Sequence, residues 1–379
     1  MTKRIAKRRL LYFVTEDWFF CSHWLPLAAA AREAGHEVFV VTRVREHGER
    51  IRKAGFRLIP MEMSRRGINP FLELLVILRL TTVYRKIRPG IVHHMGQKPM
   101  VYGSIAARMA GIPVVVNALM GLGFLFISEN PKARVGRYLV MKLYKALLNR
   151  PESHVILENP DDLRLLIDKG ILKTNHYSLI RGAGVDIRTF TVRSESGNVP
   201  LVVLASRLLW DKGVGEFVGA ARILKKQGVN ARFVLVGDRD PENPTAVSPE
   251  QLDEWQAEGV VEWWGYRSDI SEVFGQSHIV CLPSYREGVP KVLLEAAACG
   301  RPIVTSDAPG CREIVSNGQN GFLVPLRDSA AVAVALKKLI DFPDLRKSMG
   351  LKGRERVENN FTHCHINTAT LGLYAELTN

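Results

Sequence analysis

Residues 283–295 read PSYREGVPKVLLE, and the small-residue run AAACG follows at residues 296–300. This pattern predicts a corner where a strand ends, a loop crosses and a helix begins, with Pro290 in the first helical turn. Glu287 then lies in the loop and Glu295 in the helix, so both carboxylates can face one ligand. The free N–H groups and positive dipole end of such a helix suit a phosphate. The corner therefore favours a nucleotide-sugar site, with two solvated glutamates at a helix start as the alternative.

Short β-rich runs alternate with helical patterns along the chain, which indicates parallel sheets built from β-α-β units. Most of the runs are continuously apolar, as expected for strands covered on both faces. The predicted strands are residues 10–14, 37–41, 91–93, 114–116 and 153–157 in the first half, and 201–205, 232–236, 278–282 and 302–305 in the second.

The length of 379 residues suits two domains. The polar stretch 191–200 is the predicted linker. We therefore expect an α/β protein with two doubly wound domains, residues 1–190 and 191–364, facing a cleft at the carboxyl ends of their strands. The C-terminal helix, about residues 365–379, is expected to pack back on the first domain.

The net charge of +14 is unevenly distributed. Residues 1–190 contain 31 lysines and arginines against 15 aspartates and glutamates, whereas residues 191–379 contain 21 against 23. This asymmetry predicts an anionic partner for the first half, either nucleic acid or a negatively charged membrane surface. No nucleic-acid-binding motif is evident, so nucleic acid is not expected.

Two segments of the first half, residues 71–86 and 133–150, mix apolar with basic side chains and could lie in a headgroup layer. The alternative is a pair of helices packed on the sheet with their basic faces in water. No apolar run is long enough to cross a membrane, and the N-terminus lacks a signal-peptide core. We therefore expect a cytoplasmic protein, peripheral to a membrane.

Arg207 and Lys212 follow the predicted strand 201–205 and lie on one loop. Two fixed cations at that position can hold a diphosphate and stabilise its charge as it leaves. The alternative is an exposed basic pair. An NAD-dependent enzyme is disfavoured because no GxGxxG follows the first strand.

Several short motifs occur in a fixed order through the second half: SRL at 206–208 with KG at 212–213, VGD at 236–238, WGYRSD at 264–269, the glutamates of 287–295, GCRE at 310–313 and NGFLVP at 320–325. Together they resemble the donor domain of the family 4 retaining glycosyltransferases, whose fold is called GT-B. GAGVD at 182–186 is similar to the glycine-rich segment of that family. The resemblance implies a retaining, metal-independent glycosyltransferase without a cofactor.

The resemblance also implies the roles of individual donor-site residues. Glu295 should accept hydrogen bonds from the ribose hydroxyls, and Glu287 should support positive charge beside the donor sugar. The remaining donor-binding residues implied are Arg207 and Lys212 at the diphosphate, the backbone of Gly288 and Val289 near sugar or phosphate, and Arg267 in the loop by the base.

An aspartate pair, Asp238 and Asp240, resembles the metal-binding Asp-x-Asp motif of a different glycosyltransferase fold. A Mg²⁺ site is therefore an alternative. Because the resembled family has a loop there and needs no metal, none is expected.

In the first half, HHMGQK at 93–98 resembles the histidine-bearing segment of the family. His94 would then hydrogen-bond the donor sugar or an acceptor hydroxyl, with a structural histidine as the alternative. The loop after the first strand lacks the glycine pair that many members carry there.

SRRGINP at 64–70, with the charge pattern, resembles a subgroup that acts on undecaprenyl-diphosphate-linked sugars in bacterial glycan assembly. Arg65, Arg66 and Lys98 would then meet the diphosphate of the acceptor, with solvated surface residues as the alternative. The expected reaction moves an N-acetylhexosamine or hexose from a UDP-sugar to a polyprenyl-diphosphate-linked saccharide. A UDP-sugar epimerase of the same fold is the alternative, and it would act without an acceptor.

Overall fold

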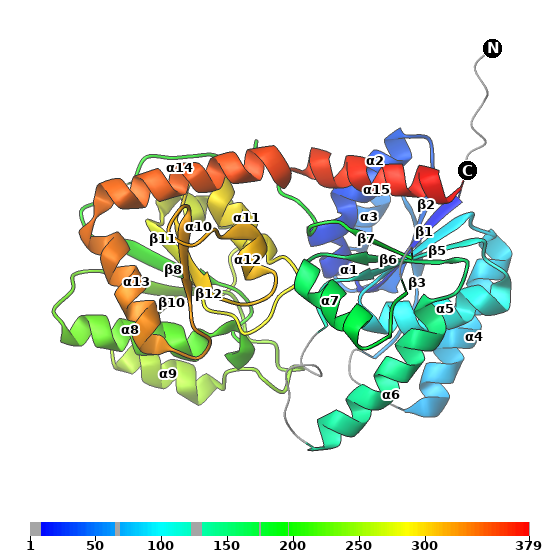
Figure 1. The fold of residues 1–379 in the computed structure, drawn as a ribbon, viewed down its shortest axis with the longest axis horizontal. Coiled ribbons are helices and arrows are strands. Elements are labelled where there is room, and N and C mark those ends of the chain that lie inside the picture. Colours follow the sequence, from blue (N-terminus) through cyan, green and yellow to red (C-terminus); the bar gives the residue numbers. More distant parts are fainter. Residues whose placement is uncertain (1–8, 65–68, 123–130, 174–175, 196, 379) are drawn as a thin grey trace, which may run out of the picture. The chain divides into compact units, whose positions relative to one another are not determined.

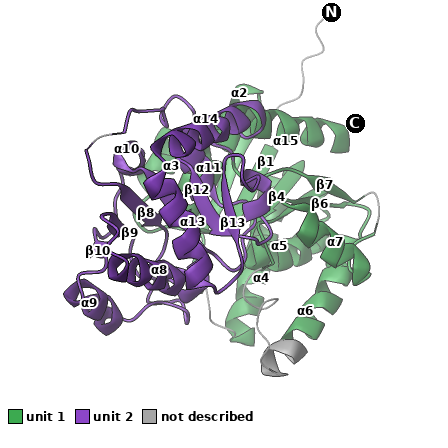
Figure 2. Cartoon of the chain, turned by 60° about the vertical axis from the view of Figure 1, so that its left-hand side comes forward, with its two compact units in different colours: residues 1–183, 363–379 green, residues 184–362 purple. Residues whose placement is uncertain are grey.

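Two parallel β-sheets organise the computed structural model of the chain, which describes residues 9–64, 69–122, 131–173, 176–195 and 197–378. Residues 1–183 and 363–379 form unit 1, and residues 184–362 form unit 2 (Figure 2). Each unit has its own sheet, covered by helices (Figure 1). The predicted α/β class with two Rossmann-like sheets is confirmed.

The sheet of unit 1 has seven parallel strands in the order β3-β2-β1-β4-β5-β6-β7. Its central strands are buried on both faces, which explains why they read as continuous apolar runs. The strands are β1 (Arg9–Glu16), β2 (Glu37–Arg43), β3 (Arg57–Pro60), β4 (Ile91–Met95), β5 (Val114–Leu119), β6 (Ser153–Leu157) and β7 (Tyr177–Leu179).

The helices of unit 1 include α15, which follows unit 2 in the sequence and packs against α2. The helix α4 begins after Asn69, whose side chain accepts a hydrogen bond from the N–H of Phe71 at 3.1 Å. The helices are α1 (Asp17–Phe19), the π-helical turn η1 (Phe20–Trp24), α2 (Leu25–Glu33), α3 (Gly48–Lys53), α4 (Pro70–Ile87), α5 (Gln97–Ala110), α6 (Pro131–Leu148), α7 (Pro160–Asp168) and α15 (His363–Leu377).

The sheet of unit 2 has six parallel strands in the order β10-β9-β8-β11-β12-β13. They are β8 (Leu201–Ala205), β9 (Arg232–Val236), β10 (Glu262–Trp263), β11 (Ile279–Leu282), β12 (Ile303–Ser306) and β13 (Gly321–Val324). From β8 the chain moves outward through β9 to β10, then returns to β11 on the other side of β8. Ligands of open α/β sheets bind at such a switch point, beyond the carboxyl ends of the strands.

The helices of unit 2 connect these strands. They are the 3₁₀ turn η3 (Trp210–Lys212), α8 (Val214–Lys226), α9 (Pro249–Ala257), α10 (Ile270–Gln276), α11 (Lys291–Ala298), α12 (Cys311–Ile314), α13 (Ser329–Asp341) and α14 (Pro343–Asn360). The predicted corner is present, but Pro290 precedes α11 as its N-cap instead of lying in the first helical turn. All nine predicted strands occur, and β3, β7, β10 and β13 are additional.

The stretch around the predicted linker is bound to unit 2. Arg346 donates two hydrogen bonds to the Glu195 carboxylate, at 2.8 and 2.6 Å. Arg301 donates to the Arg193 carbonyl at 2.8 Å, and Arg354 donates to the Phe190 carbonyl at 2.6 Å. The units divide at residues 183 and 184, before the boundary at 190 that composition suggested, because these contacts attach the segment to unit 2.

Candidate active site

Three loops meet at the switch point of unit 2, and two glycines allow them to approach closely. The N–H of Tyr285, after β11, donates to the carbonyl of Asp211, after β8, at 2.9 Å. Gly213 has φ 75°, and a Cβ there would lie 2.1 Å from the Pro283 carbonyl oxygen. A Cβ on Gly310, in the loop after β12, would overlap the backbone of Gly288. The sequence therefore needs glycine at both crossings.

An ion pair joins two of these loops. The Nζ atom of Lys212, from η3, lies 2.5 Å from Oε1 of Glu287, from the loop before α11. The two side chains are 18% and 12% exposed, so the pair is largely shielded from water. The backbone N–H of Glu287 also donates to the Pro309 carbonyl at 3.3 Å. Two residues that were assigned separately from the sequence thus lie in direct contact.

The buried thiol of Cys311 packs near this pair. Burial raises the pKa of Cys311 to about 12, and the negative charge of Glu287 acts in the same direction. Cys311 is therefore a neutral thiol at physiological pH, and it behaves as a small apolar side chain. It forms part of the low-dielectric surroundings in which the Lys212–Glu287 pair acts.

A second ion pair holds the other candidate cation. Arg207 donates from Nη1 to Oδ2 of Asp240 at 2.7 Å, and Asp240 is buried while Arg207 is partly exposed. The pair connects the loops after β8 and β9, which are neighbouring strands. In the sequence, Asp240 stood out only as half of an aspartate motif. Its pairing with Arg207 could have been expected only if β8 and β9 were known to be neighbouring strands.

Glu295 lies in α11, where it is buried and forms an ion pair with Lys291 one helical turn earlier. The pair has the i,i+4 spacing that brings side chains together on one helix face. Glu295 and Glu287 therefore come from the helix and from the loop that precedes it, as the sequence indicated. Val289, which lies between these two glutamates in the sequence, is buried, and the Gly288 carbonyl faces Gly310.

Arg267 lies in the loop after β10, where its guanidinium pairs with the Asp269 carboxylate at 2.7 and 2.5 Å. It also lies 6.0 Å from the centre of the Trp264 ring. The Gly265 carbonyl accepts a hydrogen bond from the N–H of Gly237 at 2.8 Å. This contact attaches the loop that carries Arg267 to the loop after β9.

Tyr285 supports the loop that carries Glu287, and the sequence gave no signal for this. Its hydroxyl donates to Oε1 of Glu216, from the first turn of α8, at 2.7 Å. The guanidinium of Arg327 lies 4.9 Å from the centre of the Tyr285 ring. Burial, followed by the carboxylate of Glu216, raises the pKa of Tyr285. The phenol therefore stays protonated and can donate to Glu216 at all physiological pH values.

His94 lies in the core of unit 1. Its Nδ1 atom is 2.8 Å from Oδ1 of Asn117, and its Nε2 atom is 3.0 Å from the Tyr84 hydroxyl. The ring is fully buried, and burial lowers its pKa to about 4. Both ring nitrogens have partners within the core, which supports the alternative of a structural histidine, and the expected hydrogen bond from His94 to a sugar stays a prediction.

Of the predicted acceptor residues, Lys98 is described and Arg65 and Arg66 lie outside the described residues. The Nζ atom of Lys98 lies 2.6 Å from Oε1 of the buried Glu73 and 2.5 Å from the Ser64 carbonyl oxygen. Lys98 thereby holds α4 and the residues that precede it against the start of α5.

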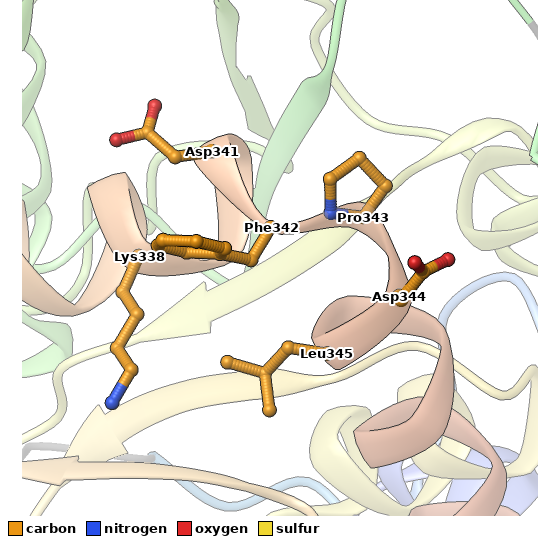
Figure 3. Close-up of a pocket in the computed structure, with 6 residues that line it drawn as sticks. All are labelled: Lys338, Asp341, Phe342, Pro343, Asp344 and Leu345. Atoms are coloured by element: carbon orange, nitrogen blue, oxygen red, sulfur yellow. The ribbon is translucent and has the colours of Figure 1, made fainter.

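The hollow drawn in Figure 3, about 310 Å³, lies between α13 and α14 of unit 2. Helix α13 follows β13 and runs back along the sheet, so its end at Asp341 lies at the amino edge of the strands. The switch-point loops lie at the opposite edge. The hollow therefore has no part in the candidate site.

Two Rossmann-like units, with cations and carboxylates gathered at the switch point of the second, define the GT-B class of glycosyltransferases. Residues 199–341 match the family model "Glycosyl transferases group 1", and residues 9–159 match "Glycosyl transferase 4-like". The chain belongs to this family, the family 4 retaining glycosyltransferases.

Curated relatives include an N,N'-diacetylbacillosaminyl-diphospho-undecaprenol alpha-1,3-N-acetylgalactosaminyltransferase of Campylobacter jejuni. It is 32% identical over 338 residues, 86% of this chain and 87% of the relative. A UDP-Gal:alpha-D-GlcNAc-diphosphoundecaprenol alpha-1,3-galactosyltransferase of Escherichia coli is 26% identical over 78% of each chain.

Solved structures share the fold. The sucrose-phosphate synthase of Thermosynechococcus elongatus has a TM-score of 0.82 at 19% identity, covering 98% of this chain and 99% of its own. Anabaena HepE in complex with UDP and glucose has a TM-score of 0.77 at 18% identity, covering 97% of this chain and 99% of its own.

Proposed function

We propose that the protein transfers a hexose or N-acetylhexosamine from a UDP-sugar to a polyprenyl-diphosphate-linked saccharide, with retention of the anomeric configuration. The observation that carries the proposal is the Lys212–Glu287 pair at the switch point of unit 2. The names of the Campylobacter and Escherichia relatives, which specify undecaprenyl-diphosphate-linked sugars, support the acceptor class. The product belongs to bacterial surface polysaccharide or glycoprotein glycan assembly.

In the proposed donor complex, Arg207 and Lys212 hold the diphosphate and neutralise its growing charge. Both cations already have a carboxylate partner, Asp240 and Glu287, which orients them before the donor binds. These side chains supply the positive charge that the leaving group requires, so the proposed reaction needs no metal ion. Glu295 accepts hydrogen bonds from the ribose hydroxyls, because an ionised carboxylate is an acceptor only.

The chemical step proposed is attack by an acceptor hydroxyl on the anomeric carbon, on the face from which the diphosphate departs. The bond from that carbon to the UDP oxygen breaks, and the proton of the hydroxyl passes to the departing diphosphate. Glu287 stabilises the positive charge that develops on the sugar ring. Arg267 and the backbone of Gly288 and Val289 complete the proposed contacts with the base, sugar and phosphates.

Unit 1 is the proposed acceptor domain. Arg65, Arg66 and Lys98 are the residues that we propose for the diphosphate of the acceptor. Because that acceptor is anchored in lipid, the enzyme should work as a peripheral protein on the cytoplasmic face of the inner membrane. No helix in the described part of the chain is both long and apolar enough to span a bilayer.

The decisive experiment is a turnover screen of nucleotide sugars with a short polyprenyl-diphosphate saccharide as acceptor. Arg207→Ala and Glu295→Ala should each lower kcat/KM for the donor about 10- to 100-fold, because each removes a charged contact worth about 1.5 to 3 kcal/mol. Arg222→Ala is the matched control, since Arg222 pairs with Glu258 on the surface of the same unit, away from the switch point.

Two outcomes would contradict the proposal. Unchanged donor kinetics in both Arg207→Ala and Glu295→Ala would remove the donor site from this position. An epimerised UDP-sugar that accumulates without any acceptor would identify the protein as an epimerase of the same fold.

A further inference from the structure

The first half of α4 exposes apolar side chains to solvent. Phe71 is 83% exposed and Leu72 is 60% exposed, and three more leucines of this half are also exposed. These are Leu74, Leu75 and Leu78. Scattered single apolar residues are normal on a protein surface, but a contiguous group indicates an interaction site.

The exposed group is separate from the face by which α4 packs on unit 1. Val76, Leu80 and Tyr84 are buried in the core between α4, α5 and the sheet. The helix therefore has a mainly apolar packed face and a separate apolar group on its outer face near its start. Helix α4 thus packs on the sheet with basic side chains in water, as in the alternative, but it also exposes the apolar group near its start.

Basic side chains continue the outer face of α4 after Leu78. Arg79, Arg85 and Lys86 are exposed, with no acidic residue among them. The start of α4 thus offers an apolar surface, and its end offers a cationic one, along a single helix. Such a surface can place apolar side chains at the acyl boundary of a bilayer and cations among its headgroups.

Two neighbouring helices extend the same pattern. In unit 1, α5 contacts both α4 and α6 (Figure 1). On α6, Tyr138 and Leu139 are exposed, and Lys142 lies over the Tyr138 ring. By sequence, α4, α5 and α6 contain ten lysines and arginines and one acidic residue, Glu73, which is buried against Lys98. Their surface therefore has a single sign of charge.

We propose that α4 docks on an anionic lipid bilayer, with Phe71, Leu72 and Leu75 inserted at the boundary between headgroups and acyl chains. Arg85 and Lys86, with Lys142 and Lys145 of α6, then lie among the anionic headgroups. A second copy of the chain fits this surface poorly, because two such basic surfaces repel each other. Nucleic acid would use the cations and leave the apolar group without a partner.

The inference rests on the proposed function in one respect: a lipid-linked acceptor brings the enzyme to a bilayer. Binding to vesicles is measured without donor or acceptor, so its result is independent of turnover. Transfer to a short, water-soluble acceptor is measured separately. Failure of one assay therefore does not imply failure of the other.

The binding test uses vesicles of phosphatidylcholine alone and of phosphatidylcholine mixed with phosphatidylglycerol, at low and at raised salt. The wild-type protein should bind the mixed vesicles and keep a salt-resistant fraction, since apolar insertion is not screened. Leu72→Gln with Leu75→Gln should lower partition about tenfold or more. Arg85→Gln with Lys86→Gln should reduce the preference for vesicles that contain phosphatidylglycerol. The fraction of protein that stays bound at raised salt should not change.

Val334→Gln with Leu351→Gln is the matched control, because both residues are exposed apolar side chains of unit 2. It should bind vesicles like the wild type. A second measurement avoids the loss of apolar side chains. The tryptophan fluorescence that Phe71→Trp adds to that of the wild type should be quenched by brominated phosphatidylcholine. The fluorescence that Phe342→Trp adds in unit 2 should not be quenched.

Two results would overturn the proposal. One is wild-type vesicle binding in Leu72→Gln with Leu75→Gln, together with an unquenched Phe71→Trp. The other is a wild-type dimer, seen by sedimentation velocity, that the leucine substitutions dissociate, because α4 would then be a contact between copies.

Discussion

Lys212 and Glu287 form an ion pair at 2.5 Å that links the loop after β8 to the loop after β11, on either side of the switch point of unit 2. In the proposed mechanism, one partner binds the leaving diphosphate and the other stabilises the reacting sugar. The ion pair therefore fixes the distance between the two charges that the transition state needs. Preorganised charges of this kind cost no rearrangement during the reaction.

The Lys212–Glu287 pair gives a prediction for a double-mutant cycle. Glu287→Gln should lower kcat more than it changes the donor KM, because its charge acts mainly on the developing oxocarbenium ion. Lys212→Met should lower kcat/KM about 10- to 100-fold. The double variant should lose less than the sum of the two single losses, since the residues are in contact.

Steady-state kinetics with varied UDP-sugar, measured on the wild type, the two single variants and the double variant, gives the four values of that cycle. Losses that simply add would show that the two residues act independently. Arg222→Ala serves as the control for a general effect of removing a surface cation.

Tyr285 gives a prediction about loop support. Tyr285→Phe removes the hydroxyl that donates to Glu216, and the other carboxylate oxygen of Glu216 already lacks a hydrogen-bond partner among the described residues. Leaving such a group unsatisfied should cost about 1 to 3 kcal/mol in the free energy of unfolding. Glu216→Gln should cost less, because its amide oxygen can still accept the bond.

Urea unfolding measures that cost, and kinetics shows whether the loop is displaced. We expect kcat to fall in Tyr285→Phe while the fold is retained. A variant with unchanged unfolding and unchanged kcat would show that the hydroxyl does not hold the loop.

Two buried histidines give a prediction for pH. Burial lowers the pKa of His94 to about 4 and that of His93 to about 3, from the ordinary value of 6.5. Between pH 6.5 and about 4, the unfolded chain binds protons at these rings and the folded chain does not. The free energy of unfolding should therefore fall as the pH falls through this window.

Unfolding of unit 1 over a pH series, followed by hydrogen exchange of β4, measures this slope. His94→Gln should be less stable at neutral pH and should show a shallower slope. A slope identical to that of the wild type would mean that His94 binds its proton equally well in the folded and the unfolded chain.

Much of unit 2 could be predicted from sequence because its features are local. The continuous apolar runs within the predicted strands 201–205 and 278–282 are typical of strands covered on both faces, and both strands are central in the sheet. Carboxyl ends of parallel strands share one edge, so the site could be placed at that edge, although the direct contact between Lys212 and Glu287 was not predicted. The order of the short motifs then gave the family.

Other features depend on packing between distant segments and could not be read from sequence. The edge strand β3 is short and only partly buried, so it has no clear periodicity. Asp240 becomes the partner of Arg207 only because β9 lies beside β8. The two partners of the His94 ring, Tyr84 from α4 and Asn117 from β5, lie at separate places in the chain.

A pair of glycine substitutions separates backbone strain from loop contact. Gly213 and Gly228 have nearly the same φ, 75° and 73°, but a Cβ at Gly228 meets nothing within 4 Å, whereas at Gly213 it would lie 2.1 Å from the Pro283 carbonyl oxygen. Gly228→Ala should therefore lose only about 1 to 2 kcal/mol, the cost of a left-handed alanine. Gly213→Ala should lose more, and it should also raise the donor KM, because the loops that carry Lys212 and Glu287 must separate. Urea unfolding and donor kinetics on both variants measure the difference, and equal losses with an unchanged KM would show that the close approach of the two loops has no part in donor binding.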